Sequence, residues 1–134
     1  MIALDTSIVV ALFASWHERH QDAEALLQDE DAQLIGHCAV ESYSVLTRLP
    51  PPHRAPPVIV RDFLVRQFPG RWLTLRDRDW KKAVRMLPQH GLRGGATYDA
   101  LIAATALSAK LTLVSFDVRA ARAYAAAGVE YQLL

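Results

Sequence analysis

Short runs of apolar residues alternate along the chain with longer segments in which apolar residues recur every three or four positions. The first run covers residues 2–4, and a segment with helical spacing follows over residues 6–14. Short continuous runs are typical of strands buried on both faces, whereas three-to-four spacing is typical of helices that bury one side. The beginning of the chain therefore predicts a buried strand that leads directly into a helix.

The same alternation continues to the end of the chain. Further strands are predicted over residues 33–36, 72–75, 111–114 and near 131–133. Further helices are predicted over residues 18–28, 39–49, 58–68, 79–89, 97–110 and 118–127. A proline-rich stretch, 50–57, predicts a stiff turn between two of these helices. Strands that alternate with helices predict an α/β fold with a parallel sheet covered on both faces.

Length and composition narrow the class of protein. A chain of 134 residues with 51% hydrophobic residues suits one globular domain over residues 1–134. No apolar run reaches the roughly twenty residues needed to cross a bilayer, and no signal-like segment precedes the first strand, so we expect a cytoplasmic protein with no membrane partner. Cys38 is the only cysteine, which excludes an internal disulfide and zinc sites with several cysteine ligands. We expect Cys38 in the core.

Charge is unevenly distributed, although the net charge is only +1. Residues 1–60 carry three basic and eight acidic side chains, whereas residues 61–95 carry nine basic and three acidic ones. The basic segment is a candidate surface for contacts with nucleic-acid phosphates, with a solvated helix face as the alternative. The candidate residues for these contacts are Arg76, Arg78, Lys81, Lys82, Arg85 and Arg93.

Four acids stand in or beside apolar runs, where an ionised carboxylate is seldom found without a partner. Asp5 ends the first apolar run, and Asp99 lies on a helical segment that is apolar nearly all round. Glu41 lies on a largely apolar helical row, and Asp117 follows the strand predicted over residues 111–114. If the four converge, their mutual repulsion raises their proton affinity unless a cation such as Mg²⁺ or Mn²⁺ lies among them.

Two of these acids are placed for convergence, because ligands of parallel sheets gather beyond the carboxyl ends of the strands. Asp5 and Asp117 both follow strands, and Ser7 and Ser115 each lie two residues from one of them. These hydroxyls could hydrogen-bond a ligand carboxylate or a water, or cap the backbone locally. Each acid also has a simpler explanation: helix N-caps for Asp5 and Asp117, a helix-dipole position for Asp99, and a solvated edge for Glu41.

A shared divalent cation would explain all four acids and would leave coordination positions open for a phosphate oxygen and a water. The pattern therefore favours metal-assisted phosphodiester hydrolysis. A second metal candidate is weaker: His17 and His20 stand three residues apart, but no further ligand accompanies them, so a solvated amphipathic helix is favoured there.

The sequence resembles the PIN-domain ribonucleases, and among them the VapC-type toxins of bacterial toxin-antitoxin pairs. The resemblance covers essentially the whole chain and is carried by residues 4–7, Glu41, residues 98–106 and residues 113–117. It implies a three-layer sandwich with a central parallel sheet of four or five strands flanked by helices. It also implies that the four acids are catalytic and line one or two Mg²⁺ or Mn²⁺ ions, with Ser115 in the hydroxyl position before the last acid.

Membership of this family would further imply cleavage of structured RNA such as tRNA or ribosomal RNA, homodimerisation, and inhibition by an antitoxin that covers the site. Two alternatives remain open. A phosphatase or phosphotransferase with Asp5 as nucleophile would need an aspartate at position 7, where Ser7 stands, and a lysine near Asp117. A non-catalytic binding module would use the acids to contact a partner protein.

Overall fold

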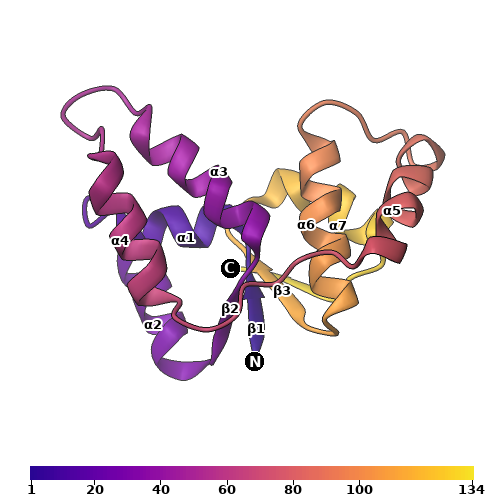
Figure 1. The fold of residues 1–134 in the computed structure, drawn as a ribbon, viewed down its shortest axis with the longest axis horizontal. Coiled ribbons are helices and arrows are strands. Elements are labelled where there is room, and N and C mark those ends of the chain that lie inside the picture. The colour runs from indigo at the N-terminus through magenta and orange to yellow at the C-terminus, as the bar shows by residue number, and fades with distance from the viewer.

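The centre of the computed structural model, which describes residues 1–134, is a parallel sheet (Figure 1). Its four strands are β1 (Ile2–Leu4), β2 (Ala32–Leu34), β3 (Thr112–Ser115) and β4 (Tyr131–Leu133). They lie in the order β2-β1-β3-β4, and each neighbouring pair is parallel. The α/β fold with a parallel sheet, predicted from the alternation of strands and helices, is confirmed.

Seven α-helices and one 3₁₀ turn connect and flank these strands. They are α1 (Thr6–Phe13), α2 (His20–Asp29), α3 (Gly36–Thr47), α4 (Pro57–Gln67), α5 (Asp77–Gln89), α6 (Ala96–Ser108), the turn η1 (Val118–Ala120) and α7 (Ala121–Ala127). In Figure 1, α1 to α4 lie on one side of the molecule and α5 to α7 on the other, with the strands between them. This is the layered arrangement that the resemblance implied. None of the helices has the length and apolar character required to cross a bilayer.

The core joins the sheet to the inner faces of α1, α3 and α6. Leu4, Ile8, Leu34, Ile102 and Leu113 are among its fully buried side chains. These residues are the apolar ones of the predicted strands and helical rows, so that the sequence pattern and the core coincide. Cys38 is buried in the same cluster, as predicted.

The segment 72–75 does not form the predicted strand. Only Leu73 pairs with the sheet, through a single parallel bridge to Ile35. The Leu73 N–H donates to the Leu34 carbonyl and the Leu73 carbonyl accepts from the Gly36 N–H, each over 2.8 Å. Because β2 ends at Leu34 and α3 begins at Gly36, no further backbone partner is available and the pairing stops after one residue.

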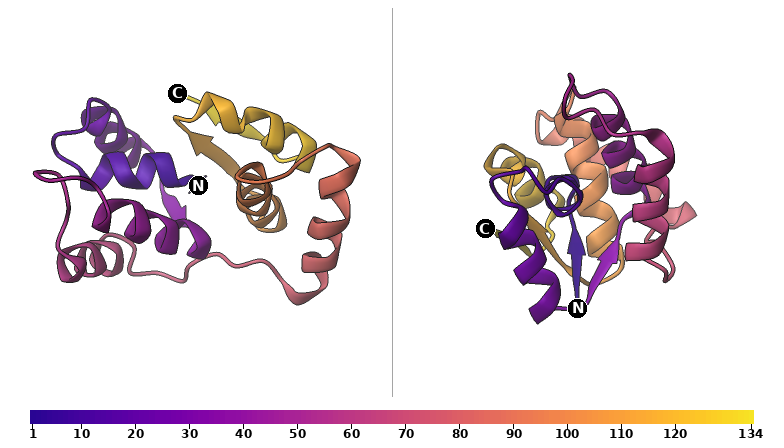
Figure 2. Two further views of the ribbon diagram at one scale, coloured as in Figure 1. Left: turned by 90° about the horizontal axis from the view of Figure 1, so that it is seen from above. Right: turned by 90° about the vertical axis from the view of Figure 1, so that its left-hand side faces the viewer.

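Helix α5 stands at the outside of the molecule (Figure 2). None of its residues is buried, and its main packing partner is α6. Ala83, Met86 and Leu87 are half-buried, while the basic side chains of the helix are exposed. The basic side chains of this outer helix are therefore solvated, and their contacts with phosphates stay a prediction.

Candidate active site

The sheet order places two of the four acids side by side. Strands β1 and β3 are neighbours with Leu4 opposite Val114, so the chain leaves both strands at the same edge. The Asp5 N–H extends this pairing by donating to the Val114 carbonyl over 3.1 Å. Asp5 and Asp117 therefore emerge at the carboxyl ends of adjacent strands, which is where parallel sheets collect ligands.

The other two acids reach this edge from helices. Helix α3 starts there because it directly follows β2, and Glu41 lies in its second turn. Helix α6 precedes β3 and runs antiparallel to it, so the N-terminal end of α6 lies at the same edge of the sheet. Asp99 is in the first turn of this helix. All four acids line one cleft of about 460 Å³, together with Ser7.

Asp5 is held rigidly at the base of this cleft and is only 4% exposed. Its Oδ2 accepts hydrogen bonds from the Ser7 hydroxyl at 2.7 Å and from the Ser115 hydroxyl at 2.8 Å. The same hydroxyls accept from the backbone, Ser7 from the Phe116 N–H and Ser115 from the Asp117 N–H, each at 2.9 Å. The two serines therefore fix Asp5 and tie the chain after β1 to the chain after β3.

Both aspartates cap a helix or turn and also line the cleft. Asp5 is the N-cap of α1, and Asp117 caps η1 by accepting from the Arg119 N–H over 3.0 Å. Every hydrogen bond to the Asp5 carboxylate goes to Oδ2, and none goes to Oδ1. Capping therefore orients these carboxylates without using up their oxygens.

Glu41 has a positioning partner that the sequence reasoning missed. His37 Nε2 lies 3.0 Å from Glu41 Oε2, one helical turn away on α3. The His37 ring also stacks on Tyr98, with centroids 5.6 Å apart and planes 11° from parallel. The four-residue spacing of His37 and Glu41 was the available signal, since such pairs face each other on a helix.

The negative charge of the cleft affects the pKa of Asp99. Burial, followed by the charges of Asp5, Asp117 and Glu41, raises the pKa of Asp99 to about 6, against a partial lowering by His37. The raised pKa shows that the three other carboxylates act on Asp99 in the folded protein. A cation in the cleft would reverse this repulsion.

Two further titratable groups lie against the site and add no charge at neutral pH. Burial and the nearby Asp5 carboxylate raise the pKa of the Cys38 thiol well above its usual value. The same two causes raise the pKa of Tyr124, whose hydroxyl is buried without a hydrogen-bond partner. The negative charge of the site therefore comes from its carboxylates.

The residues present fit a hard divalent cation. Carboxylate oxygens are the ligands that Mg²⁺ and Mn²⁺ prefer, and the Oδ1 of Asp5, which accepts no hydrogen bond, and the repulsion at Asp99 both favour a positive ion. No three acidic, histidine or cysteine side chains stand close enough together to form a preformed metal site. A cation in this cleft would therefore bind directly to one or two of the carboxylates and keep several waters, as Mg²⁺ usually does.

The cationic residues of the cleft differ from those predicted. Arg19 and Arg119 line it, and the Arg19 guanidinium lies 4.0 Å from the centre of the Phe116 ring. None of the six candidate RNA-binding residues lines it. Five of the six belong to α5 or its N-cap, and Arg93 lines a separate hollow. Arg19 and Arg119 escaped the sequence reasoning because they lie outside the basic segment.

The two histidines spaced three residues apart do not form a metal site. His17 Nδ1 accepts from the Arg19 N–H over 3.0 Å. The His20 ring contacts the Ala11 carbonyl through Nδ1 and Glu24 through Nε2. His17 lies in the turn before α2 and lines the acid cleft, whereas His20 is the first residue of α2, so the two rings do not share a helix face.

Comparison with known proteins agrees with this geometry. The family model described as "PIN domain" matches residues 2–126. The chain is 46% identical to ribonuclease VapC40 of Mycobacterium tuberculosis over 134 residues, covering 100% of this chain and 99% of the relative.

Two solved structures show the same fold. VapC20 of Mycobacterium tuberculosis, described as a toxin that cleaves the sarcin-ricin loop, has a TM-score of 0.73 and 20% identity over 96% of each chain. VapBC2 from Rickettsia felis, bound to a promoter DNA fragment, has a TM-score of 0.70 and 16% identity, covering 100% of this chain and 99% of the other. The family match and the full-length relative together assign the chain to the PIN-domain family and, within it, to the VapC-type ribonucleases.

Proposed function

We propose that this protein is a divalent-metal-dependent endoribonuclease and the toxin of a toxin-antitoxin pair. The observation that carries the proposal is the convergence of Asp5, Glu41, Asp99 and Asp117 in one cleft at the carboxyl edge of the sheet. The 46% identity to a named VapC ribonuclease supports the choice of RNA as substrate.

In this proposal the four acids hold one or two Mg²⁺ or Mn²⁺ ions. Such an ion lowers the pKa of water and offsets the negative charge that develops on a phosphate under attack. Ser7 and Ser115 keep the Asp5 carboxylate in one orientation by donating to Oδ2. His37 orients Glu41 in the same way, so that the oxygens need not be ordered when the substrate binds.

The test is RNA cleavage with and without metal. The purified protein should cut tRNA or ribosomal RNA at a small number of positions in Mg²⁺ or Mn²⁺, and EDTA should abolish cleavage because the carboxylates alone repel the phosphate. Gel electrophoresis of the RNA and mapping of the new ends provide the measurement. A homogeneous preparation that binds an antitoxin tightly and cuts no RNA with either metal would instead favour the non-catalytic binding module.

The phosphatase alternative has less support. That chemistry needs a second aspartate at position 7. This position carries a serine, whose hydroxyl donates a hydrogen bond to Asp5.

We further propose structured RNA, tRNA or ribosomal RNA, as substrate, following the sarcin-ricin loop named for VapC20. Contacts of the exposed α5 cations with RNA remain a prediction, as does homodimerisation.

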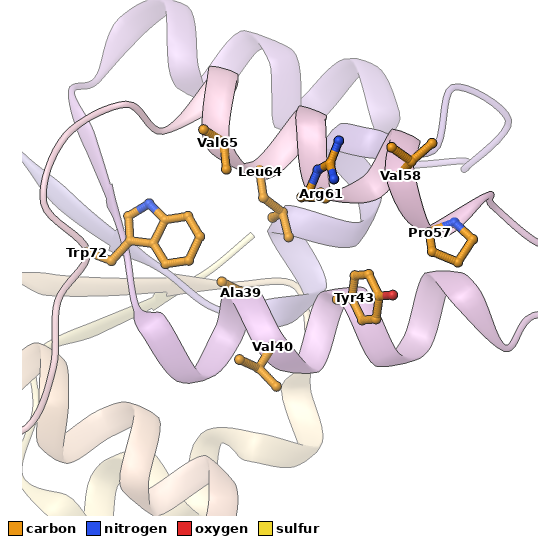
Figure 3. A pocket seen from close by; sticks show the side chains of 9 residues that line it. All are labelled: Ala39, Val40, Tyr43, Pro57, Val58, Arg61, Leu64, Val65 and Trp72. Carbon is orange, nitrogen blue, oxygen red and sulfur yellow. The ribbon is translucent and has the colours of Figure 1, made fainter.

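An antitoxin partner is proposed for the apolar groove between α3 and α4, which has a volume of about 520 Å³ (Figure 3). Val40 is 69% exposed, Val58 48% and Val65 56%, and together these valines make an apolar surface with no partner. Figure 3 shows Trp72 at one end of the groove and Pro57 at the other. Helix α3 separates the groove from the cleft, with Val40 lining the groove and Glu41 lining the cleft.

The expected occupant is an amphipathic segment of the antitoxin that carries an acidic side chain. Arg61 lines the groove and its side chain is 65% exposed, although it also contacts Asp62. A segment seated between α3 and α4 could continue across α3 into the acid cleft. Occupation of the groove would therefore be coupled to inhibition of cleavage.

Val65→Lys should weaken antitoxin binding about tenfold, because it puts a charge into the centre of an apolar contact. RNA cleavage by the free protein should be unchanged. Val84→Lys is the matched control, since Val84 is 60% exposed on α5 and lies outside the groove. Titration calorimetry with the antitoxin and sedimentation of the free protein provide the measurements. If Val65→Lys changes only the oligomeric state, the groove is a contact between two copies instead.

A further inference from the structure

Three arginines converge on a hollow next to the acid cleft. Arg93, Arg119 and Arg122 line this hollow, which has a volume of about 320 Å³ and no acidic residue in its wall. Arg119 and Arg122 lie three residues apart on the contiguous turn η1 and helix α7, and Arg93 lies in the loop before α6. The fold brings Arg93 to the other two charges.

The hollow and the cleft are joined by Arg119, which lines both. Its Nε lies 3.7 Å from Asp117 Oδ1, and its side chain is 92% exposed. Arg119 therefore stands at the boundary between a strongly negative site and a strongly positive one. A polyanion that passes the carboxylates would meet the three guanidinium groups next.

The other two arginines are available for a ligand. Neither Arg93 nor Arg122 forms an ion pair with an acidic side chain, although Arg119, Arg19 and Arg76 each do. Arg122 is also ordered in advance, because its Nη2 donates to the His90 carbonyl over 3.0 Å. Guanidinium groups bind phosphate oxygens with two parallel hydrogen bonds, and a pre-ordered side chain loses less entropy when it does so.

We propose that Arg93, Arg119 and Arg122 form a subsite for an RNA phosphate that flanks the phosphodiester cut in the acid cleft. This inference rests on the proposed ribonuclease function. Four carboxylates repel an RNA backbone, and a bound metal ion offsets that repulsion only at the phosphate it contacts. The neighbouring phosphate needs its own cations, and the arginine hollow adjoins the cleft and holds two arginines, Arg93 and Arg122, that form no ion pair.

The first test measures RNA binding as a function of salt. It uses a fluorescent RNA hairpin that the unmodified protein cleaves, bound to Asp99→Asn protein so that the RNA stays intact. Adding Arg93→Ala or Arg122→Ala should weaken binding about fivefold and reduce the slope of log K against log salt by about 0.7 for the lost phosphate contact. Arg122→Lys should recover part of the affinity because it keeps the charge.

The matched control is Arg66→Ala, which removes the same charge from an exposed position on α4 outside both hollows. Arg93 makes no side-chain hydrogen bond within the protein, so its variant remains informative even if Arg122→Ala loosens the chain near His90. Slopes for Arg93→Ala and Arg122→Ala equal to that of Arg66→Ala would overturn the subsite.

The second test removes the charge from the RNA. Replacing one flanking phosphate with a neutral methylphosphonate should weaken binding about fivefold, and the same replacement should have no further effect on the protein lacking Arg93 and Arg122. Additive losses would overturn the proposal. So would unchanged RNA binding with a weakened antitoxin complex, which would assign the hollow to an acidic segment of the antitoxin.

Different results would contradict the proposed function and the arginine subsite. If the unmodified protein cleaves no RNA, the proposed function fails and the subsite falls with it. If the unmodified protein cleaves RNA and the arginine variants behave like Arg66→Ala, the subsite alone is wrong.

Discussion

Asp99→Asn is expected to reduce RNA cleavage by at least about a thousandfold while leaving the fold intact. The substitution removes a charge from the acid cleft and changes the volume of the side chain very little. Asp99 makes no hydrogen bond to another protein group through its carboxylate, so the substitution takes an acceptor from no neighbouring donor. Initial rates on a labelled RNA in Mn²⁺ and circular dichroism of the same preparation provide the measurement.

The control is Asp29→Asn, which makes the same chemical change at an exposed position of α2 that forms no ion pair. It should cleave RNA at the unmodified rate. Asp5→Asn should be inactive like Asp99→Asn, because the carboxylates of Asp5 and Asp99 would bind metal at the same site. Full activity in either cleft variant would refute the assignment of the four acids.

Asp99→Asn should also raise the free energy of unfolding when metal is absent. The pKa of Asp99 is raised from 3.8 to about 6, so the folded state holds this proton more tightly than the unfolded chain does. As pH rises from about 4 to 6 the unfolded state loses the proton first, and the free energy of unfolding falls. Above pH 6 the charged form is penalised in full, by about 1 kcal/mol once solvent screening of this half-buried group is allowed for.

Asp99→Asn removes this penalty. In EDTA at pH 7.5 it should therefore unfold a few degrees above the unmodified protein, and the difference should vanish as pH falls towards 4. Mg²⁺ should reverse the order, because the metal stabilises the folded state only when the carboxylates bind it. Thermal unfolding across pH 4–8, with Asp29→Asn alongside, provides the measurement. Lower stability of Asp99→Asn in EDTA at pH 7.5 would mean that Asp99 makes favourable contacts that outweigh the repulsion.

Strands and helices could be predicted wherever the spacing of apolar residues indicates which side chains are buried. The runs at 2–4 and 111–114 became neighbouring central strands, since a strand buried on both faces has no polar position to interrupt it. The segment 72–75 has the same pattern and is not a strand. The length of its pairing depends on how many residues of β2 remain free beside it. The sequence of the segment itself does not specify that number.

The boundaries of helices were less well determined by the pattern. Helix α3 begins at Gly36, three residues before the predicted start, and no side chain caps it. The start of this helix depends on where β2 releases the chain, which is a tertiary event. The predicted helix over 118–127 is divided because Asp117 caps a 3₁₀ turn before α7 begins.

Sequence alone determined the alternation of strands and helices and singled out four acids, because a carboxylate among apolar residues is costly wherever the chain folds. It could not place Arg93 beside Arg119 and Arg122, nor bring Ser115 to Asp5 over a separation of 110 residues. Those contacts depend on the order β2-β1-β3-β4 and on the packing of α6 beside α7. Electrostatic and hydrogen-bond energies depend on distances between atoms, and for residues far apart in the chain only the tertiary structure sets those distances.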